Sequence, residues 1–240
     1  MIKHLLDALG LSPSVAIAAA RVPHAPYPTP STNLVYNLLF CDEPARFAVA
    51  PGNAPSPWQR TLFAEPADPT ALRALAVDSS QEGRIRYLAF SKLRQLGQHV
   101  PPKILLGVII EVPLERGLDT LAAFSEGGVH YINQADKLLV VEDMNIVKPQ
   151  VMKLFASVEH SLDRIGPWTE QRLAPPKEVV RFTFLVSDGM YFGQGPMEVM
   201  QTEAIAGPII HQGAVLLQAV TEIGLRAEKQ AQAGGTATLH

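Results

Sequence analysis

The sequence has a single cysteine and few charged residues, and each shortage narrows the class of protein. Cys41 has no second cysteine to pair with, so an internal disulfide framework is excluded and a reducing compartment is favoured. Charged residues make up 18% of the chain, against roughly 25% in typical soluble domains. A surface short of charge favours a homo-oligomer or a standing protein partner. The alternative is a composition rich in alanine, leucine and proline with many neutral surface positions.

Long apolar runs are also missing. No stretch approaches the ~18–20 apolar residues that span a bilayer. The first twenty residues are apolar overall, but Asp7, Gly10 and Ser12-Pro13 interrupt the unbroken centre that an export signal needs. We therefore expect no membrane partner and a cytoplasmic location. The net charge of -3 lacks the basic field of a nucleic-acid binder, so no nucleic-acid partner is expected.

Known metal-binding and nucleophile spacings are absent as well. No two of the seven histidines lie within ten residues of each other, so neither a zinc-protease pair nor a Cys/His finger can form locally. Ligands gathered from distant segments are the alternative. The motifs G-x-S-x-G and S-x-x-K do not occur. Asp42 and Glu43 would raise the thiol pKa of Cys41, which favours a small core residue over a nucleophile.

The segment Gly193-Gln194-Gly195-Pro196 resembles a phosphate-binding loop only at first sight. The dinucleotide pattern needs a small residue three places after the second glycine, and Glu198 occupies that place. A turn followed by a proline-started helix explains the same residues. We therefore predict no cofactor and no metal.

The most regular pattern lies in Lys103–Asp143. Its first apolar run has no polar alternation, which is typical of a strand covered on both faces. A turn at Glu126-Gly127-Gly128 and a second one at 133–137 separate the strands that follow. The meander strands are expected at Ile104–Val112, Leu118–Ser125, Val129–Asn133 and Leu138–Glu142. Val179–Val186 is also strand-like, and Met190–Phe192 is placed to pair back with it.

Helical spacing of apolar residues predicts most of the remaining structure. Helices are expected at Ser31–Cys41, Thr70–Val77, Ile85–Leu96, Val151–Ile165, Pro196–Glu203 and Pro208–Leu225. A strand at Val35–Phe40 is an alternative to the first of these. Ser79-Ser80-Gln81-Glu82 matches a capping box for the third. The fourth has a regular apolar seam that would pack on the sheet, or alternatively on a copy of itself. Phe47–Pro69 is expected to be loop, with one possible strand at Arg60–Phe63.

The predicted fold is α+β: an antiparallel meander sheet of about five strands, with helices packed on one face and extra helices at both ends. Proline-rich segments divide the chain. Residues 1–30 would be a helical arm (Ile2–Leu9 and Pro13–Arg21) with a Pro-rich linker, and residues 31–174 a central α+β domain. Residues 175–240 would be a C-terminal strand and helix subdomain packed on the central domain, with Gln230–His240 frayed.

Three polar residues inside the apolar sheet block are the candidate site residues: Glu111, His130 and Tyr131. Glu111 would act as an acid or base if an apolar wall raised its pKa. Alternatively it faces water at the sheet rim or pairs with Arg116. His130 or Tyr131 would line a pocket if the sheet curls, and a hairpin with a wet outer face is the alternative.

Three functions fit these observations. The favoured one is a non-catalytic protein that acts through self-association or protein–protein interaction, because every catalytic motif fails and the helices carry apolar seams. The second is a small-molecule binding module with a pocket formed by the curved sheet. The third is an enzyme whose site is assembled from dispersed residues, among which Glu111, His130 and Tyr131 would lie in a cleft with shifted pKa values.

Overall fold

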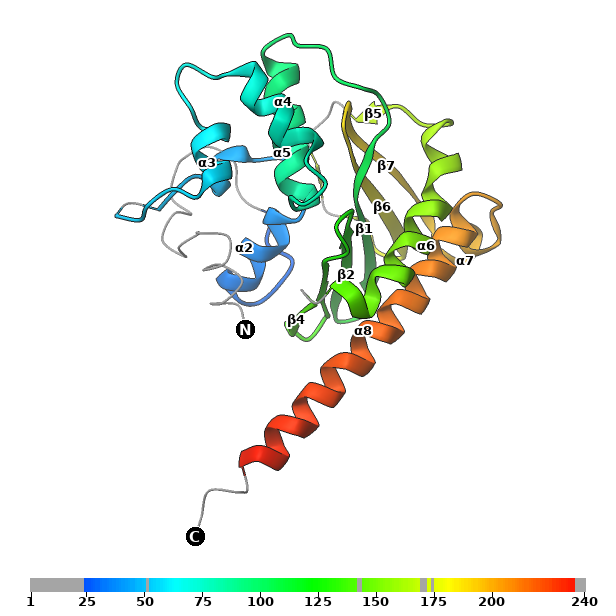
Figure 1. Ribbon diagram of the computed structural model, residues 1–240. Helices are drawn as coiled ribbons and strands as arrows, with labels where there is room; N and C mark the ends of the chain where they lie inside the picture. Colours follow the sequence, from blue (N-terminus) through cyan, green and yellow to red (C-terminus); the bar gives the residue numbers. More distant parts are fainter. Residues whose placement is uncertain (1–23, 51, 142–143, 169–171, 174, 236–240) are drawn as a thin grey trace.

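Within the described residues of the computed structural model, seven strands form one antiparallel sheet in the order β4-β3-β2-β1-β6-β7-β5 (Figure 1). The described residues are 24–50, 52–141, 144–168, 172–173 and 175–235. The strands are β1 (Leu105–Leu114), β2 (Gly117–Phe124), β3 (Val129–Ile132), β4 (Leu138–Val141), β5 (Pro167–Trp168), β6 (Val179–Val186) and β7 (Gly189–Pro196). The α+β class and the antiparallel meander are confirmed, since β1 to β4 lie side by side in chain order.

The described sheet has seven strands where about five were predicted. β7 continues through Gly193 and Gly195, which pair with Phe182 and Val180 of β6, so these glycines form a strand rather than the predicted turn. β5 is a two-residue strand that pairs with β7 at one edge of the sheet. A proline is tolerated there because an edge strand needs only one of its two hydrogen-bonding sides.

β1 lies at the centre of the sheet, between β2 and β6. Its side chains alternate between two apolar cores: Ile109 belongs to one, and Val108 and Ile110 belong to the other. A strand with a core on each side has no wet face, which explains the run without polar alternation. The predicted interior position of this strand is confirmed.

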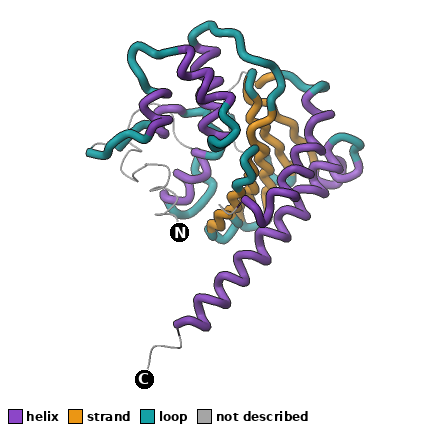
Figure 2. Tube along the Cα trace, in the orientation of Figure 1, coloured by secondary structure: helices purple, strands orange, loops and turns teal. Residues whose placement is uncertain are grey.

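Helices cover both faces of the sheet, so the prediction of helices on one face is wrong (Figures 1 and 2). The reason is that neighbouring strands carry apolar side chains on both of their sides. One face is covered by α2 (Pro30–Leu38), α3 (Pro57–Leu62), α4 (Pro69–Val77) and α5 (Gly83–Gln95), with a short 3-10 helix, η2 (Pro44–Phe47). The other is covered by α6 (Met144–Leu162) and α8 (Ala206–Gly235), with α7 (Met197–Thr202) beside them.

Residues 57–62 form helix α3, so the predicted loop with a strand at Arg60–Phe63 is wrong. The helix starts at Pro57, and a capping box precedes it. The Gln59 amide donates to Ser56 Oγ at 3.4 Å, and the Ser56 amide donates to Gln59 Oε1 at 2.9 Å. Local capping therefore overrides the short strand-like run.

The capping box predicted at Ser79–Glu82 does not form. Asp78 Oδ1 accepts hydrogen bonds from the Ser80 amide at 2.9 Å and from the Ser80 hydroxyl at 2.6 Å. These bonds hold residues 78–81 in a turn, and α5 begins only at Gly83. The Ser80 hydroxyl is thus bonded within an Asx turn before the helix starts, and the N-cap residue Glu82 makes no side-chain capping bond.

The seam of α6 packs on the sheet, as predicted. Val151 and Val158 are fully buried in the core that contains Val108 of β1. The helix begins at Met144, before the predicted start at Val151, so Pro149 lies inside it, in the second turn. Proline has no amide hydrogen, so one hydrogen bond to the first turn of the helix is missing.

α8 is longer than the predicted helix Pro208–Leu225 and includes residues 226–235. Its 30 residues correspond to about 45 Å at 1.5 Å per residue. Two glycines allow it to lie close to the sheet. A Cβ at Gly213 would lie 2.6 Å from Ile110 Cδ1, and one at Gly224 would lie 2.8 Å from Leu139 Cδ2. The C-terminal part of the helix extends past the sheet (Figure 2).

The division of the chain at residues 30 and 174 remains a prediction, although β6 and β7 belong to the same sheet as β1. The predicted N-terminal helices Ile2–Leu9 and Pro13–Arg21 lie outside the described residues. Of the helices that are described, none is both long and apolar enough to cross a lipid bilayer.

Candidate functional site

The structure separates the three residues that the sequence singled out. Glu111 and His130 point to the face covered by α2–α5, whereas Tyr131 points to the face covered by α6 and α8. Glu111 of β1 lies opposite Thr120 of β2, and His130 of β3 lies opposite Ala122 of β2. The three side chains therefore do not form one site.

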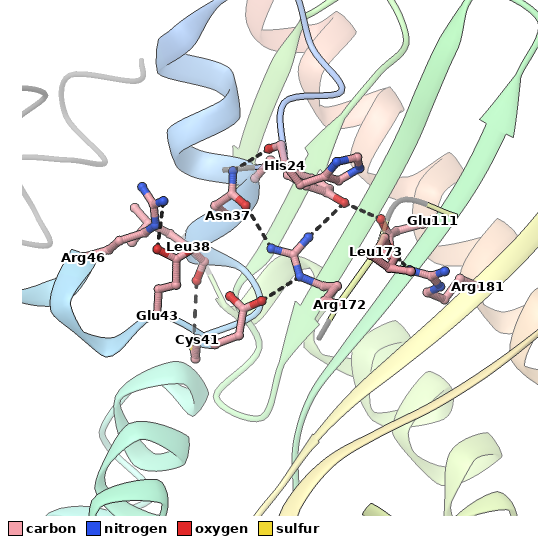
Figure 3. Close-up of polar contacts among 12 residues, drawn as sticks. His24, Asn37, Leu38, Cys41, Glu43, Arg46, Glu111, Arg172, Leu173 and Arg181 are labelled. Atoms are coloured by element: carbon pink, nitrogen blue, oxygen red, sulfur yellow. Dashed lines mark hydrogen bonds and ion pairs between the residues drawn. The ribbon is translucent and has the colours of Figure 1, made fainter. Parts of the chain in front are cut away.

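Glu111 is fully buried, so the alternative in which it faces water or pairs with Arg116 is wrong. The Tyr36 hydroxyl of α2 donates a hydrogen bond of 2.5 Å to Glu111 Oε1. Arg172 Nη1 in turn donates to the Tyr36 hydroxyl oxygen at 3.2 Å (Figure 3). A hydrogen-bonded chain thus runs from the central strand through α2 to the segment that follows β5.

Each nitrogen of the Arg172 guanidinium donates a hydrogen bond to a group in α2 or just after it. Its Nε donates to Asp42 Oδ2 at 2.9 Å and its Nη2 to Asn37 Oδ1 at 2.9 Å (Figure 3). The guanidinium lies 3.8 Å from the centre of the Phe40 ring, a cation–π contact. All three of its nitrogens are therefore used within the fold.

Arg181 of β6 lies directly opposite Glu111 in the sheet. Its Nη2 donates to Gln194 Oε1 of β7 at 2.9 Å, and its Nη1 donates to the Leu173 carbonyl oxygen. Burial raises the pKa of Glu111, while the Tyr36 hydrogen bond and the charges of Arg172 and Arg181 act in the opposite direction.

A cavity beside this network is too small for an organic substrate. It is lined by Trp168, Arg172, Arg181, Thr183, Met190 and Phe192, and its volume is about 10 Å³. That is about the space of one water molecule. The buried network is thus arranged to hold α2 and the chain after β5 on the sheet, and this cavity leaves no room for a reacting molecule. A separate hollow of about 380 Å³ borders Arg172 and Asp42.

His130 is also enclosed. Its ring packs edge-on against Phe124, with 5.5 Å between the ring centres. Burial, together with the positive charge of Arg84, holds the histidine pKa well below its ordinary value. The imidazole is therefore neutral at physiological pH. The described residues contain no group of three or more His, Cys, Asp or Glu side chains that could bind a metal ion.

Tyr131 is the one candidate among the three that borders open space. Its hydroxyl donates to Asp119 Oδ2 at 2.7 Å, and Asp119 Oδ1 accepts from the Gln134 amide at 2.7 Å. Burial and the Asp119 carboxylate raise the pKa of Tyr131, so it stays a neutral donor. The ring forms part of the wall of two neighbouring hollows between the sheet and α8.

The two hollows follow one side of α8 and have volumes of about 260 and 380 Å³. The first is floored by Ile110 and Leu121 of the sheet, and the second by Leu139. On the helix they are lined by Ile210, Ala214, Leu217, Thr221 and Leu225, spaced by four, three, four and four residues. We call these five residues, with Tyr131 opposite them, the α8 groove.

No family model, curated protein or solved structure matches the chain.

The α8 groove is the candidate feature that sequence reasoning missed. The apolar residues of α8 were visible, since Ile209, Ile210, Leu217 and Val220 recur at helical spacing. Ile209, Leu216 and Val220 are buried against the sheet, whereas Leu225 is 53% exposed. At 100° per residue, these three buried residues lie within about 40° of one another around the helix, whereas the stripe that ends at Leu225 extends over about 180°. The available signal in the sequence was an apolar stripe too wide to be covered by packing on the sheet alone.

Proposed function

We propose that this protein acts without catalysis, by self-association through the α8 groove. The observation that carries the proposal is the row of α8 residues from Ile210 to Leu225 beside two open hollows. In this row Ala214 and Leu225 are exposed, and Leu217 is partly buried. Exposed apolar surface rimmed by polar groups is characteristic of association sites.

The enclosed state of the polar candidates supports the same proposal. Glu111 is bonded to Tyr36 and has no organic-sized cavity beside it, and His130 is packed against Phe124. Chemistry on a substrate requires that a reacting atom reach such groups. The α8 groove is open and largely apolar, and apolar surface supplies the driving force for protein association.

The test is Leu225→Asp, which places a charge in the groove without touching the core. Val77→Asp on α4 is the matched control, because Val77 is 56% exposed and Leu225 is 53% exposed, and α4 covers the opposite face of the sheet. We expect sedimentation equilibrium to show that the wild type and Val77→Asp associate, and that Leu225→Asp shifts the midpoint to at least tenfold higher concentration. A monomeric wild type at high micromolar concentration would overturn the proposal.

A small apolar ligand in the 260 Å³ hollow is the second candidate function, and one observation favours it. The Tyr131–Asp119 pair places two polar groups in the wall of an otherwise apolar hollow, the usual arrangement for orienting a ligand. Tyr131→Phe, which removes the polar hydroxyl from the wall of the hollow without filling it, discriminates the two. A ligand oriented by the hydroxyl would bind more weakly to this variant, as read by competition with the apolar probe ANS, whereas the sedimentation data should not change.

A further inference from the structure

We infer that two copies meet in antiparallel orientation along α8, with Leu225 of each copy against Ala214 of the other. The inference rests on the proposed function and specifies its partner and geometry. It uses the exposed edge of the α8 groove, Ala214, Leu217, Thr221 and Leu225, which recur every three or four residues on one side of the helix. Such a row is a helix-packing seam.

The sizes of the seam residues are complementary in the antiparallel arrangement. A two-fold axis halfway between residues 214 and 225 places Ala214 against Leu225 and Leu217 beside Thr221. Each large side chain then meets a smaller one, which is how facing helices interdigitate. In a parallel arrangement each residue faces its own copy, so Leu225 would meet Leu225 and Ala214 would face a gap.

The groove also contains a hollow that can accommodate Leu225 of the partner copy. Ala214 lies at the rim of the 260 Å³ hollow, whose walls include Ile210, Leu217 and, from the sheet, Leu121. A leucine from the partner that approaches Ala214 would enter this hollow and exchange water for apolar walls. The two-fold axis repeats the insertion in the second copy, so Leu225 of each protomer closes the 260 Å³ hollow of the other.

Charge at the two ends of the groove favours the same orientation. Near the start of α8 lie the carboxylates of Asp119, Glu198 and Glu203, with the guanidinium of Arg164 close to Glu203. Toward its other end lie Lys137, Arg226 and Lys229, with Asp136, Glu222 and Glu228 among them. The first end is thus net negative and the second is close to neutral. An antiparallel pair keeps the two negative ends apart, whereas a parallel pair brings them together.

Disulfide trapping tests this geometry with the full chain. Cys41 is only 3% exposed, so it is retained in every variant and should not form cross-links. We expect a 1:1 mixture of Ala214→Cys and Leu225→Cys to form a disulfide-linked dimer under mild oxidation, seen on a non-reducing gel. Neither variant alone should do so, because the two copies of residue 214 would be about 16 Å apart along the helices, beyond the reach of a disulfide. Val77→Cys mixed with either variant is the control.

Exchange of sizes gives a second, independent measurement. Leu225→Ala should weaken association roughly tenfold by losing a buried leucine, and Ala214→Leu should weaken it by crowding the same contact. The double variant Ala214→Leu/Leu225→Ala again pairs one large with one small residue, so we expect association close to that of the wild type.

The outcomes separate the inference from the proposed function. A dimer by mass that yields cross-links with Leu225→Cys alone is parallel, and the inference is then wrong while self-association stands. The same holds for a dimer in which the mixture fails to cross-link and the double variant is not rescued. A wild type that stays monomeric removes both.

Discussion

Glu126 offers a pH-dependent test of how helix α5 is held on the sheet. It lies in the turn between β2 and β3, and its Oε2 accepts a hydrogen bond of 2.8 Å from the amide of Gly83, the first residue of α5. Burial and the nearby charge of Glu82 raise its pKa from 4.5 to about 7, although the amides of Glu126 and Gly83 and the charge of Arg84 oppose the rise. The turn therefore favours a protonated carboxyl.

The magnitude follows from the two pKa values. A group whose folded-state pKa is raised stabilises the fold below its unfolded pKa, and this contribution is lost as the pH rises through the folded value. For Glu126 the loss extends from about pH 4.5 to above pH 7 and amounts to about 3 kcal/mol. The variant Glu126→Gln cannot ionise and keeps an oxygen for the Gly83 amide. We thus expect it to be more stable than the wild type at pH 8 and close to it at pH 4.5.

The assay is urea unfolding of both proteins at several pH values between 4.5 and 8, with the difference between their free energies of unfolding plotted against pH. Other titrating groups are common to both proteins and cancel in this difference. Glu115→Gln, an exposed residue in the β1–β2 turn, is the matched control and should give a flat difference. A flat difference for Glu126→Gln as well would refute the assignment of a raised pKa to this residue.

Two further substitutions test the packing around the sheet. Tyr36→Phe leaves Glu111 Oε1 and Arg172 Nη1 without the bridging hydroxyl, so we expect urea unfolding to show a loss of about 1–3 kcal/mol; a loss below about 0.5 kcal/mol would contradict the bridging role. Gly83→Ala should destabilise, although alanine ordinarily favours a helix by up to about 1 kcal/mol, because its Cβ would clash with the backbone oxygen of Leu106, which cannot turn aside. A free energy of unfolding equal to or above that of the wild type would disprove the contact.

The central meander could be predicted because its signals are local. The β1 run is apolar on both sides, and the turns that follow it contain glycine, asparagine and aspartate at the expected places. The number of strands could not be predicted in the same way. Gly193 and Gly195 read as a turn until β6 supplies a neighbour that holds them extended. Pairing with the neighbouring strand decides the conformation of such residues, and local propensity does not.

The environment of Glu111 shows a similar limit. From the sequence, a carboxylate near the end of a strand has its nearest cation at Arg116. In the structure its hydrogen-bond partner is Tyr36, 75 residues earlier, and the arginines near it are Arg172 and Arg181. Nothing within a few residues of Glu111 indicates that α2 covers this side of β1. The sequence identified an informative residue, and its partners came from tertiary packing.

The α8 groove escaped prediction for a different reason. An apolar stripe shows that a helix is buried somewhere, but its width has meaning only once the contact on the sheet is known. α8 approaches the sheet through Gly213 and Gly224, so its contact is narrow and close. Residues on the adjoining side, from Ala214 to Leu225, are therefore left outside the contact although they continue the stripe.

We interpret the buried Glu111 network and the α8 groove as features with separate roles. A buried ion network adds little net stability, because desolvation of its charges offsets their attraction. It does discriminate between packings, since an alternative placement of α2 would strand Glu111 away from Tyr36 and leave Arg172 without Asp42. We therefore interpret the Glu111 network as a device that fixes one arrangement of helices on the first face. The α8 groove, which we propose as the association surface, lies on the other face, so substitutions on the two faces should separate folding from association.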